Sequence, residues 1–137
     1  VYPAKQSWNL IWMENYNKDR LQLIKGEFYM RKDEVQEIAF QIIAYAGDAF
    51  TYFNQAIDSA EQGDMEKVKK QFQKGTDELK RAHDAQTSLL TYEANGQEIS
   101  FSIIMVHAQD HLTMAIFAQR MAKHFIKLWK ERRSEDV

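Results

Sequence analysis

Helix-breaking residues are almost absent from this chain. Its single proline is Pro3, and five glycines are spread over 137 residues. Proline ends or kinks a helix and glycine weakens its interior, so most of the sequence is free to be helical. The hydrophobic fraction of 45% is ordinary for a globular protein, and the length suffices for one domain with a core. We therefore expect an all-α domain.

Apolar side chains recur at helical spacing in three long segments. The first runs from about residue 33 to 62 and ends at Gly63, which suits a left-handed position after a helix, and Asp64 can cap the next helix. The second covers 65–94 and the third about 99–132. Because the links are short, we expect an antiparallel, up-down-up three-helix bundle. The positions expected to face the core of the first two helices are Val35, Ile38, Ala39, Ile42, Ala46, Phe50, Phe53 and Ile57, then Val68, Phe72, Leu79, Ala82 and Leu89.

The third segment differs from the other two because it is apolar on two sides. One side can pack on the first two helices of the same chain, and the other needs a second partner. The sequence therefore predicts an oligomer whose contacts are made largely by the third helix. The two apolar sets are Ile103, Met114, Phe117, Met121 and Leu128, and Ile104, Ala108, Leu112, Ala115, Ala122 and Ile126.

Two histidines and an aspartate interrupt the first of these sets. His107, Asp110 and His111 stand at i, i+3 and i+4, so they share one helical face. A lone carboxylate among apolar side chains is costly unless it is paired, protonated or bound to a metal. In an oligomer with threefold symmetry, three copies of Asp110 could meet on the axis. Three carboxylates together would require a hard divalent cation such as Mg²⁺.

The overall composition excludes several classes of function. The net charge of -2 gives no indication of nucleic-acid binding. The absence of cysteine excludes disulfides, thiolate metal sites and cysteine nucleophiles in this chain, and it fits a cytoplasmic location. No apolar run approaches the roughly 20 residues that a membrane-spanning helix needs.

Four segments of the chain resemble one protein family, the IIA components of the lactose/cellobiose-type, phosphoenolpyruvate-dependent sugar phosphotransferase system. The segments occur in the order and at the spacing typical of the family, and they cover nearly everything after residue 33. They are IAFQIIAYAGDA at 38–49, AH and QT within 82–87, EANG at 93–96 and VHAQDHL at 106–112.

The resemblance implies a homotrimer of three-helix subunits, which together form a nine-helix bundle. It also implies a phosphoryl carrier with a phosphohistidine intermediate. The family's phosphorylated histidine falls on His107, with Nε2 as the reacting atom, and the family's metal ligand on the trimer axis falls on Asp110. One Mg²⁺ per trimer would be shared by three copies of Asp110.

The resemblance also implies the partners. The phosphoryl donor would be the small histidine phosphocarrier protein, and the acceptor a cysteine of the cognate IIB component. The transported sugar would be of the lactose, cellobiose or chitobiose type. This chain would not bind the sugar directly and would reach the membrane only through the IIC component.

Other polar residues could support the phosphorylation site. His111 and Gln109 stand beside His107 in the sequence and could line the site. His83 and Gln86 are expected on the inward side of the second helix, where they could border the site across a subunit boundary or satisfy each other. His124, among the basic last turns, is expected to be a solvated or interface residue. Each of these residues also has a purely structural interpretation.

Two other functions compete with this interpretation. The histidines and Asp110 could form half of a dinuclear metal site in a helical bundle, although such sites need several inward-facing glutamates that the first helix lacks. The chain could also be a non-enzymatic helical interaction module, which would leave the acid in the apolar stripe unexplained.

Residues 1–29 lie outside the resemblance, and we treat residues 30–137 as the phosphotransferase IIA helical domain. The extension contains Trp8 and Trp12 and could form an amphipathic helix that packs on the bundle or on a partner. Alternatively, it is translated leader. Codons for Lys-Gly-Glu at 25–27 can read as a ribosome-binding sequence, with Met30 as the true initiator. The gene sequence before Met30 would distinguish these hypotheses.

Overall fold

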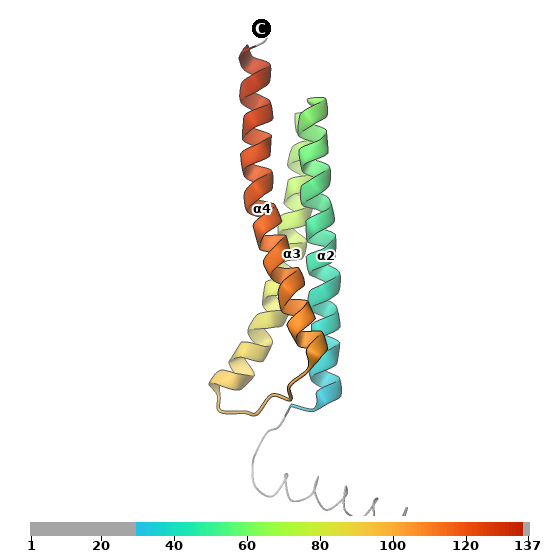
Figure 1. Cartoon of the computed structure of the whole chain (residues 1–137), viewed down its shortest axis with the longest axis vertical. Helices are drawn as coiled ribbons and strands as arrows, with labels where there is room; N and C mark the ends of the chain where they lie inside the picture. Colours follow the sequence, from blue (N-terminus) through green and yellow to red (C-terminus); the bar gives the residue numbers. More distant parts are fainter. Residues whose placement is uncertain (1–29, 136–137) are drawn as a thin grey trace, which may run out of the picture.

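The computed structural model describes residues 30–135, and these form three long helices. They are α2 (Lys32–Gln62), α3 (Met65–Ala94) and α4 (Ile103–Glu135), and each runs antiparallel to the one before it (Figure 1). The expected all-α, up-down-up three-helix fold is therefore confirmed. The hypotheses about residues 1–29 lie outside the described residues. None of the three helices is both long and apolar enough to cross a bilayer.

The turn between α2 and α3 has the geometry that its sequence predicts. Gly63 adopts the left-handed conformation, with φ of 82°, and its N–H donates to the carbonyl of Ala60 at 3.1 Å. The N–H of Asp64 donates to the carbonyl of Ser59 at 2.9 Å. The Asp64 carboxylate in turn accepts the backbone N–H of Lys67 at 3.0 Å and caps α3. These bonds satisfy backbone groups at two helix ends and reverse the chain.

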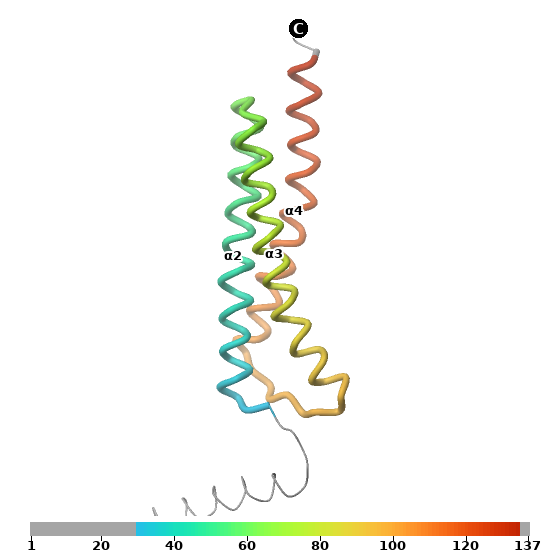
Figure 2. The backbone as a smooth tube through the Cα atoms, turned by 180° about the vertical axis from the view of Figure 1, so that it is seen from behind, coloured from blue at the N-terminus to red at the C-terminus, as the bar shows by residue number. Residues whose placement is uncertain are grey.

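The central helix of the bundle is α2, because it packs extensively against both α3 and α4, whereas those two helices contact each other much less. Figure 2 shows that α3 leans away from α2 in its C-terminal half, and that the C-terminal half of α4 stands apart at the other end. The core therefore follows one side of α2. Its largest fully buried side chains are Phe53, Ile42 and Val35.

One position of the predicted core is wrong. Phe50 is 39% exposed, whereas its neighbour Ala49 is fully buried. Successive residues on a helix are turned by about 100°, so the buried stripe that continues from Ala46 through Ala49 to Phe53 carries Phe50 off to the side. The core positions expected in α3 are confirmed: Val68, Leu79, Ala82 and Leu89 are buried, and Phe72 is partly buried with its ring 5.2 Å from that of Phe53.

The start of α4 also differs from the prediction, which placed it near residue 99. Ile99 instead forms an isolated parallel bridge with Met30, and the helix begins at Ile103. The carbonyl of Ser102 accepts the N–H of Met105 at 3.1 Å, the first bond of the new helix. Serine is a favoured residue at this position. The apolar side chain of Ile99 packs against the core without being helical.

Candidate functional site

The two apolar sides of α4 have different environments. The set that includes Ala108, Leu112, Ala115 and Ala122 is buried against the bundle. The set that includes Asp110 faces outward, and four of its five apolar members are more than half exposed: Ile103 79%, Met114 54%, Phe117 63% and Leu128 59%. The fifth, Met121, is partly buried. The predicted division of α4 into an inner face and an unpartnered face is therefore confirmed within one chain.

His107 and His111 form a contact pair on the outward side of α4. Their ring centroids are 4.6 Å apart and the rings meet edge to face, at 86°. His107 is exposed and His111 is partly buried. Buried Ala108 and Leu112, each one residue further along, hold this stretch of α4 on the core. His107 therefore presents its imidazole to an approaching molecule while its neighbour restrains one side of the ring.

Asp110 is exposed and forms no ion pair with any other residue in the range 30–135. That range contains no group of three or more histidine, aspartate or glutamate side chains that could hold a metal ion. Asp110 is therefore not part of a set of three such side chains within the described residues. Its exposed carboxylate stands on the apolar, outward face of α4, where a molecule from outside can reach it.

The two glutamines of the predicted site pair with each other. Gln86 of α3 donates a hydrogen bond from its side-chain Nε2 to the side-chain Oε1 of Gln109 on α4. The Nε2 of Gln109 lies 3.6 Å from the sulfur of Met105. Residues at i and i+2 on a helix point in different directions. Gln109 is therefore turned toward α3, away from the side of α4 that carries His107.

The placement expected for His83 is wrong. His83 is exposed rather than inward, because the buried side of α3 runs through Leu79, Ala82 and Leu89 and the next residue after Ala82 is turned about 100° away from it. Gln86 lies nearer the inward side and is partly buried. His83 and Gln86 consequently do not satisfy each other, and His124 is exposed as expected.

A hollow of about 320 Å³ separates the C-terminal half of α3 from the start of α4. The paired amides of Gln86 and Gln109 line it, together with Val106, the residue directly before His107. Two further lining side chains, Leu90 at 53% and Phe101 at 79%, are strongly exposed. Neither residue was predicted from the sequence, although an apolar side chain beside the loop that precedes the motif is a usable signal.

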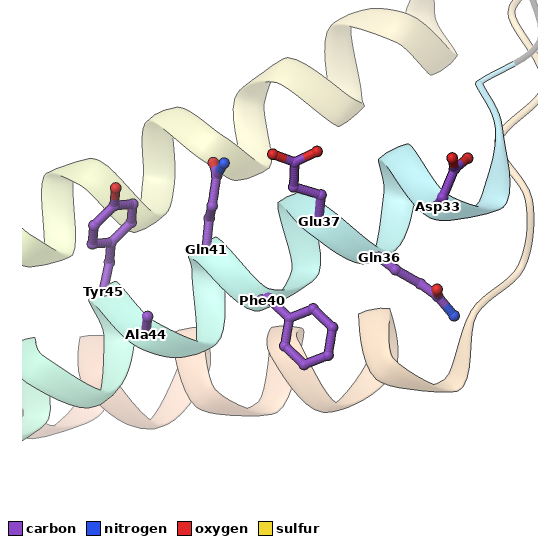
Figure 3. Close-up of a pocket in the computed structure, with 7 residues that line it drawn as sticks. All are labelled: Asp33, Gln36, Glu37, Phe40, Gln41, Ala44 and Tyr45. Atoms are coloured by element: carbon purple, nitrogen blue, oxygen red, sulfur yellow. The ribbon is translucent and has the colours of Figure 1, made fainter.

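A second hollow, of about 560 Å³, lies on the outer side of α2 and contains none of the predicted site residues (Figure 3). All its lining residues come from α2, so it is a shallow surface feature. Figure 3 shows Phe40 pointing away from the side on which Glu37, Gln41 and Tyr45 project. At its end, a hydrogen bond from the Arg31 guanidinium lowers the pKa of Asp33, an exposed carboxyl.

The described residues can be compared with the alternative function of a dinuclear metal site. A dinuclear centre in a helical bundle needs several carboxylates and histidines that converge within the chain. No such group occurs in the described part of this chain. The apolar inner side of α2 agrees with that result, since Val35, Ile42 and Phe53 occupy the inward positions where ligands would stand.

Comparisons with known proteins agree with this geometry. Residues 37–130 match the family model described as the lactose/cellobiose-specific IIA subunit of the phosphotransferase system. A lactose-specific EIIA component of Staphylococcus epidermidis is 39% identical over 102 residues, which are 74% of this chain and 98% of that protein. The lichenan-specific IIA component of Bacillus subtilis is 38% identical over 99 residues, 72% of this chain and 90% of that protein. The crystal structure of the cellobiose-specific enzyme IIA from Bacillus anthracis is 34% identical, with a TM-score of 0.71, over 77% of this chain and 94% of that one.

Proposed function

Since the chain belongs to the lactose/cellobiose-specific IIA subunits of the sugar phosphotransferase system, we propose that it carries a phosphoryl group on His107. The observation that carries this proposal is the position of His107. It is an exposed imidazole in the second turn of a helix whose other side is anchored in the core, and it stands at the start of the segment that resembles the family's phosphorylation motif.

The reaction requires a neutral imidazole on His107. In a neutral imidazole one ring nitrogen carries the proton and the other carries a lone pair, which can attack phosphorus. Nε2 of His107 attacks the phosphorus of the donor, the donor's nitrogen–phosphorus bond breaks, and its electron pair returns to the donor nitrogen. Little covalent work is left to the protein, so position and charge decide the rate.

Side-chain donors are needed for the charge that the reaction brings. His107 stands in the second turn of α4, beyond the first turn in which the helix dipole and the free N–H groups stabilise an anion. His111 touches His107, and its ring N–H can donate a hydrogen bond to a phosphoryl oxygen. The Gln109 amide, turned toward α3, is not placed to do so for His107 of the same chain.

The partners follow from the proposed chemistry. The donor is the histidine phosphocarrier protein and the acceptor is a cysteine of the cognate IIB component, whose thiolate displaces the imidazole of His107. The sugar, of the lactose, cellobiose or chitobiose type, is bound elsewhere in the system. The chain works in the cytoplasm and reaches the membrane through the IIC component.

Assembly as a homotrimer accounts for the outward face of α4. A trimer that packs three such faces together removes Met114, Phe117 and Leu128 from water. The same packing brings three copies of Asp110 together. Their carboxylate oxygens would hold one Mg²⁺, which would neutralise the converging charges.

Incubation with phosphoenolpyruvate, enzyme I of the system, the histidine phosphocarrier protein and Mg²⁺ tests the proposal. The chain should gain one phosphoryl group, detected by intact mass, in a linkage that is labile in acid and stable in base. The variant His107→Ala should gain none, because the acceptor nitrogen is lost. His124→Ala is the matched control and should be phosphorylated like the unmodified chain, since His124 is exposed in a distant part of α4.

Two results would count against this function. Phosphorylation of His107→Ala at the unmodified rate would place the acceptor elsewhere in the chain. A complete lack of phosphorylation of the folded, unmodified chain would favour a non-enzymatic interaction module. Metal analysis alone does not separate these possibilities, because the carrier is also expected to bind an ion.

A further inference from the structure

A groove of about 480 Å³ lies between the first turns of α3 and the last turns of α4, far along α4 from His107. Its apolar part is formed by Val68 and Phe72 of α3 and by Ile126 of α4. Val68 is buried, whereas Phe72 and Ile126 are partly exposed and pack against the edge of the core. The groove therefore offers apolar contact surface that the described chain does not fully cover.

Four lysines surround this apolar surface. Lys69 of α3 stands on one side, and Lys123, Lys127 and Lys130 of α4 stand on the other. Of the described side chains that line the groove, none is acidic. The combination of an apolar surface with a single sign of charge contrasts with the chain as a whole, whose net charge is -2.

Most of this charge is not neutralised within the described range. Lys127 lies 3.6 Å from Glu131, but both side chains are more than half exposed, so the pair is weak. Lys123 lies over the Phe72 ring at 5.9 Å. Neither Lys69 nor Lys130 has a carboxylate within 4.0 Å among residues 30–134. Their charges are available to an external partner.

The groove is separate from the face proposed for the trimer. Lys123 and Lys130 point to nearly the opposite side of α4 from Asp110 and Leu128, because 13 residues separate Lys123 from Asp110 and a helix turns about 100° at each residue. Packing of three α4 helices through Asp110 would therefore leave the lysines facing outward. A partner could bind the groove while the trimer stays intact.

From these observations, we propose that the groove binds an acidic segment of another protein, which places an apolar side chain between α3 and α4. The concave apolar surface suits an inserted side chain, whereas a lipid bilayer presents a broad, flat anionic surface. A nucleic-acid backbone would bind the lysines but would leave the apolar side chains of Phe72 and Ile126 without apolar contacts. Charge complementarity favours the acidic segment, because lysines around an apolar centre reject basic sequences and attract acidic ones.

Fluorescence anisotropy of the full chain with a labelled synthetic peptide tests this proposal. The probe is a peptide in which leucines repeat at helical spacing between glutamates, and a second peptide replaces the leucines with serines. The groove variant is Lys123→Glu with Lys130→Glu. The matched control, Lys32→Glu with Lys80→Glu, makes the same charge change at exposed lysines outside the groove. Circular dichroism confirms that both variants are folded.

We expect the groove variant to bind the leucine peptide at least about tenfold more weakly than the unmodified chain, and the control variant to change by less than about threefold. The unmodified chain should bind the serine peptide more weakly than the leucine peptide. Equal loss in the two variants, or no binding of the leucine peptide at all, would overturn the proposal. Tighter binding to phosphatidylglycerol vesicles or to polyuridylate, lost in the same groove variant, would overturn it in favour of a membrane or a nucleic acid.

Discussion

At the scale of single residues, the contact between His107 and His111 is the structural detail closest to the proposed chemistry. One ring is exposed and the other is partly buried, and they meet edge to face. The exposed ring can reach a donor protein, while the partly buried ring is held in place by the helix and its neighbours. His111 can therefore orient His107 and donate a hydrogen bond to its phosphoryl group, but it is not needed as the acceptor.

The variant His111→Ala should consequently slow phosphorylation of His107 without abolishing it. We expect the initial rate to fall by about tenfold, because losing one hydrogen bond costs up to about 1.5 kcal/mol and about 1.4 kcal/mol is a factor of ten in rate. Rapid-quench measurement with the phosphorylated histidine phosphocarrier protein would give this rate, and His111→Gln should recover part of it because the amide can still donate. An unchanged rate in His111→Ala would leave His111 with a structural role only.

The residue types at the site were predictable from the sequence, but the directions in which some of their side chains point were not. The motif that includes His107 and Asp110 was sufficient to predict that the two share one face of a helix, and the structure leaves both exposed. Gln109 was grouped with His107 because the two are close in sequence, yet the helix turns it toward Gln86. His83 was expected on the inward side and is exposed. This prediction failed because the apolar periodicity of a 30-residue helix does not fix the direction of a single side chain to better than one residue.

At the scale of the helices, two interior glycines have opposite surroundings. A Cβ added to Gly75 of α3 would lie 2.8 Å from the Phe53 ring, a distance that the packed core cannot accommodate without a shift. A Cβ added to Gly47 of α2 would meet no atom of the chain within 4 Å. The first glycine therefore permits close packing of α3 on α2, whereas the second only weakens its helix.

These surroundings predict that replacing glycine by alanine has opposite effects on stability at the two positions. Gly47→Ala should raise the free energy of unfolding by about 0.5–1 kcal/mol, through helix propensity alone. Gly75→Ala should lower it by about 1–3 kcal/mol, because it overpacks the core beside Phe53. Urea denaturation followed by circular dichroism measures both. Destabilisation by Gly47→Ala would reveal that another copy of the chain packs closely against this part of α2.

The helices themselves were largely predictable because their ends carry local signals. Gly63 and Asp64 end one helix and begin the next with the expected bonds. The start of α4 was placed too early because Ile99 is apolar and continues the helical spacing. Only the tertiary structure shows that Ile99 pairs with Met30 and that Ser102 accepts the first helical bond. A sequence pattern cannot distinguish an apolar loop residue from an apolar helical one.

At the scale of the whole molecule, the exposed apolar face of α4 is the feature that a single chain cannot satisfy. Ile103, Met114, Phe117 and Leu128 are each more than half exposed, and they follow one side of the helix. A continuous apolar strip of this length marks an interaction surface. The proposed trimer covers it and places Asp110 at the centre of the assembly.

The chain should therefore sediment as a trimer at micromolar concentration. Phe117→Lys should shift it toward a monomer, because three new cations would be brought into the apolar contact. Leu90→Lys is the control: Leu90 is also exposed, at 53%, but it lies beside the hollow on α3. Analytical ultracentrifugation distinguishes these states. A monomer of the unmodified chain would mean that another protein covers this face.

Replacement of Asp110 by leucine tests the proposed ion separately. The variant should remain a trimer, and its thermal unfolding should be insensitive to a chelator, because it removes three converging charges together with the need for a cation. The unmodified chain should unfold at a lower temperature after chelation. Dissociation of Asp110→Leu into monomers would show that metal ligation stabilises the trimer by more than the carboxylates cost.

The central claim is that His107 carries the phosphoryl group, and phosphorus–nitrogen correlation by NMR on the phosphorylated, ¹⁵N-labelled chain tests it most directly. We predict a single phosphorus signal correlated with Nε2 of His107, lost on mild acid treatment and on transfer to the IIB component. A signal correlated with His83, His111 or His124, or a phosphoryl group on an oxygen atom, would contradict the assignment.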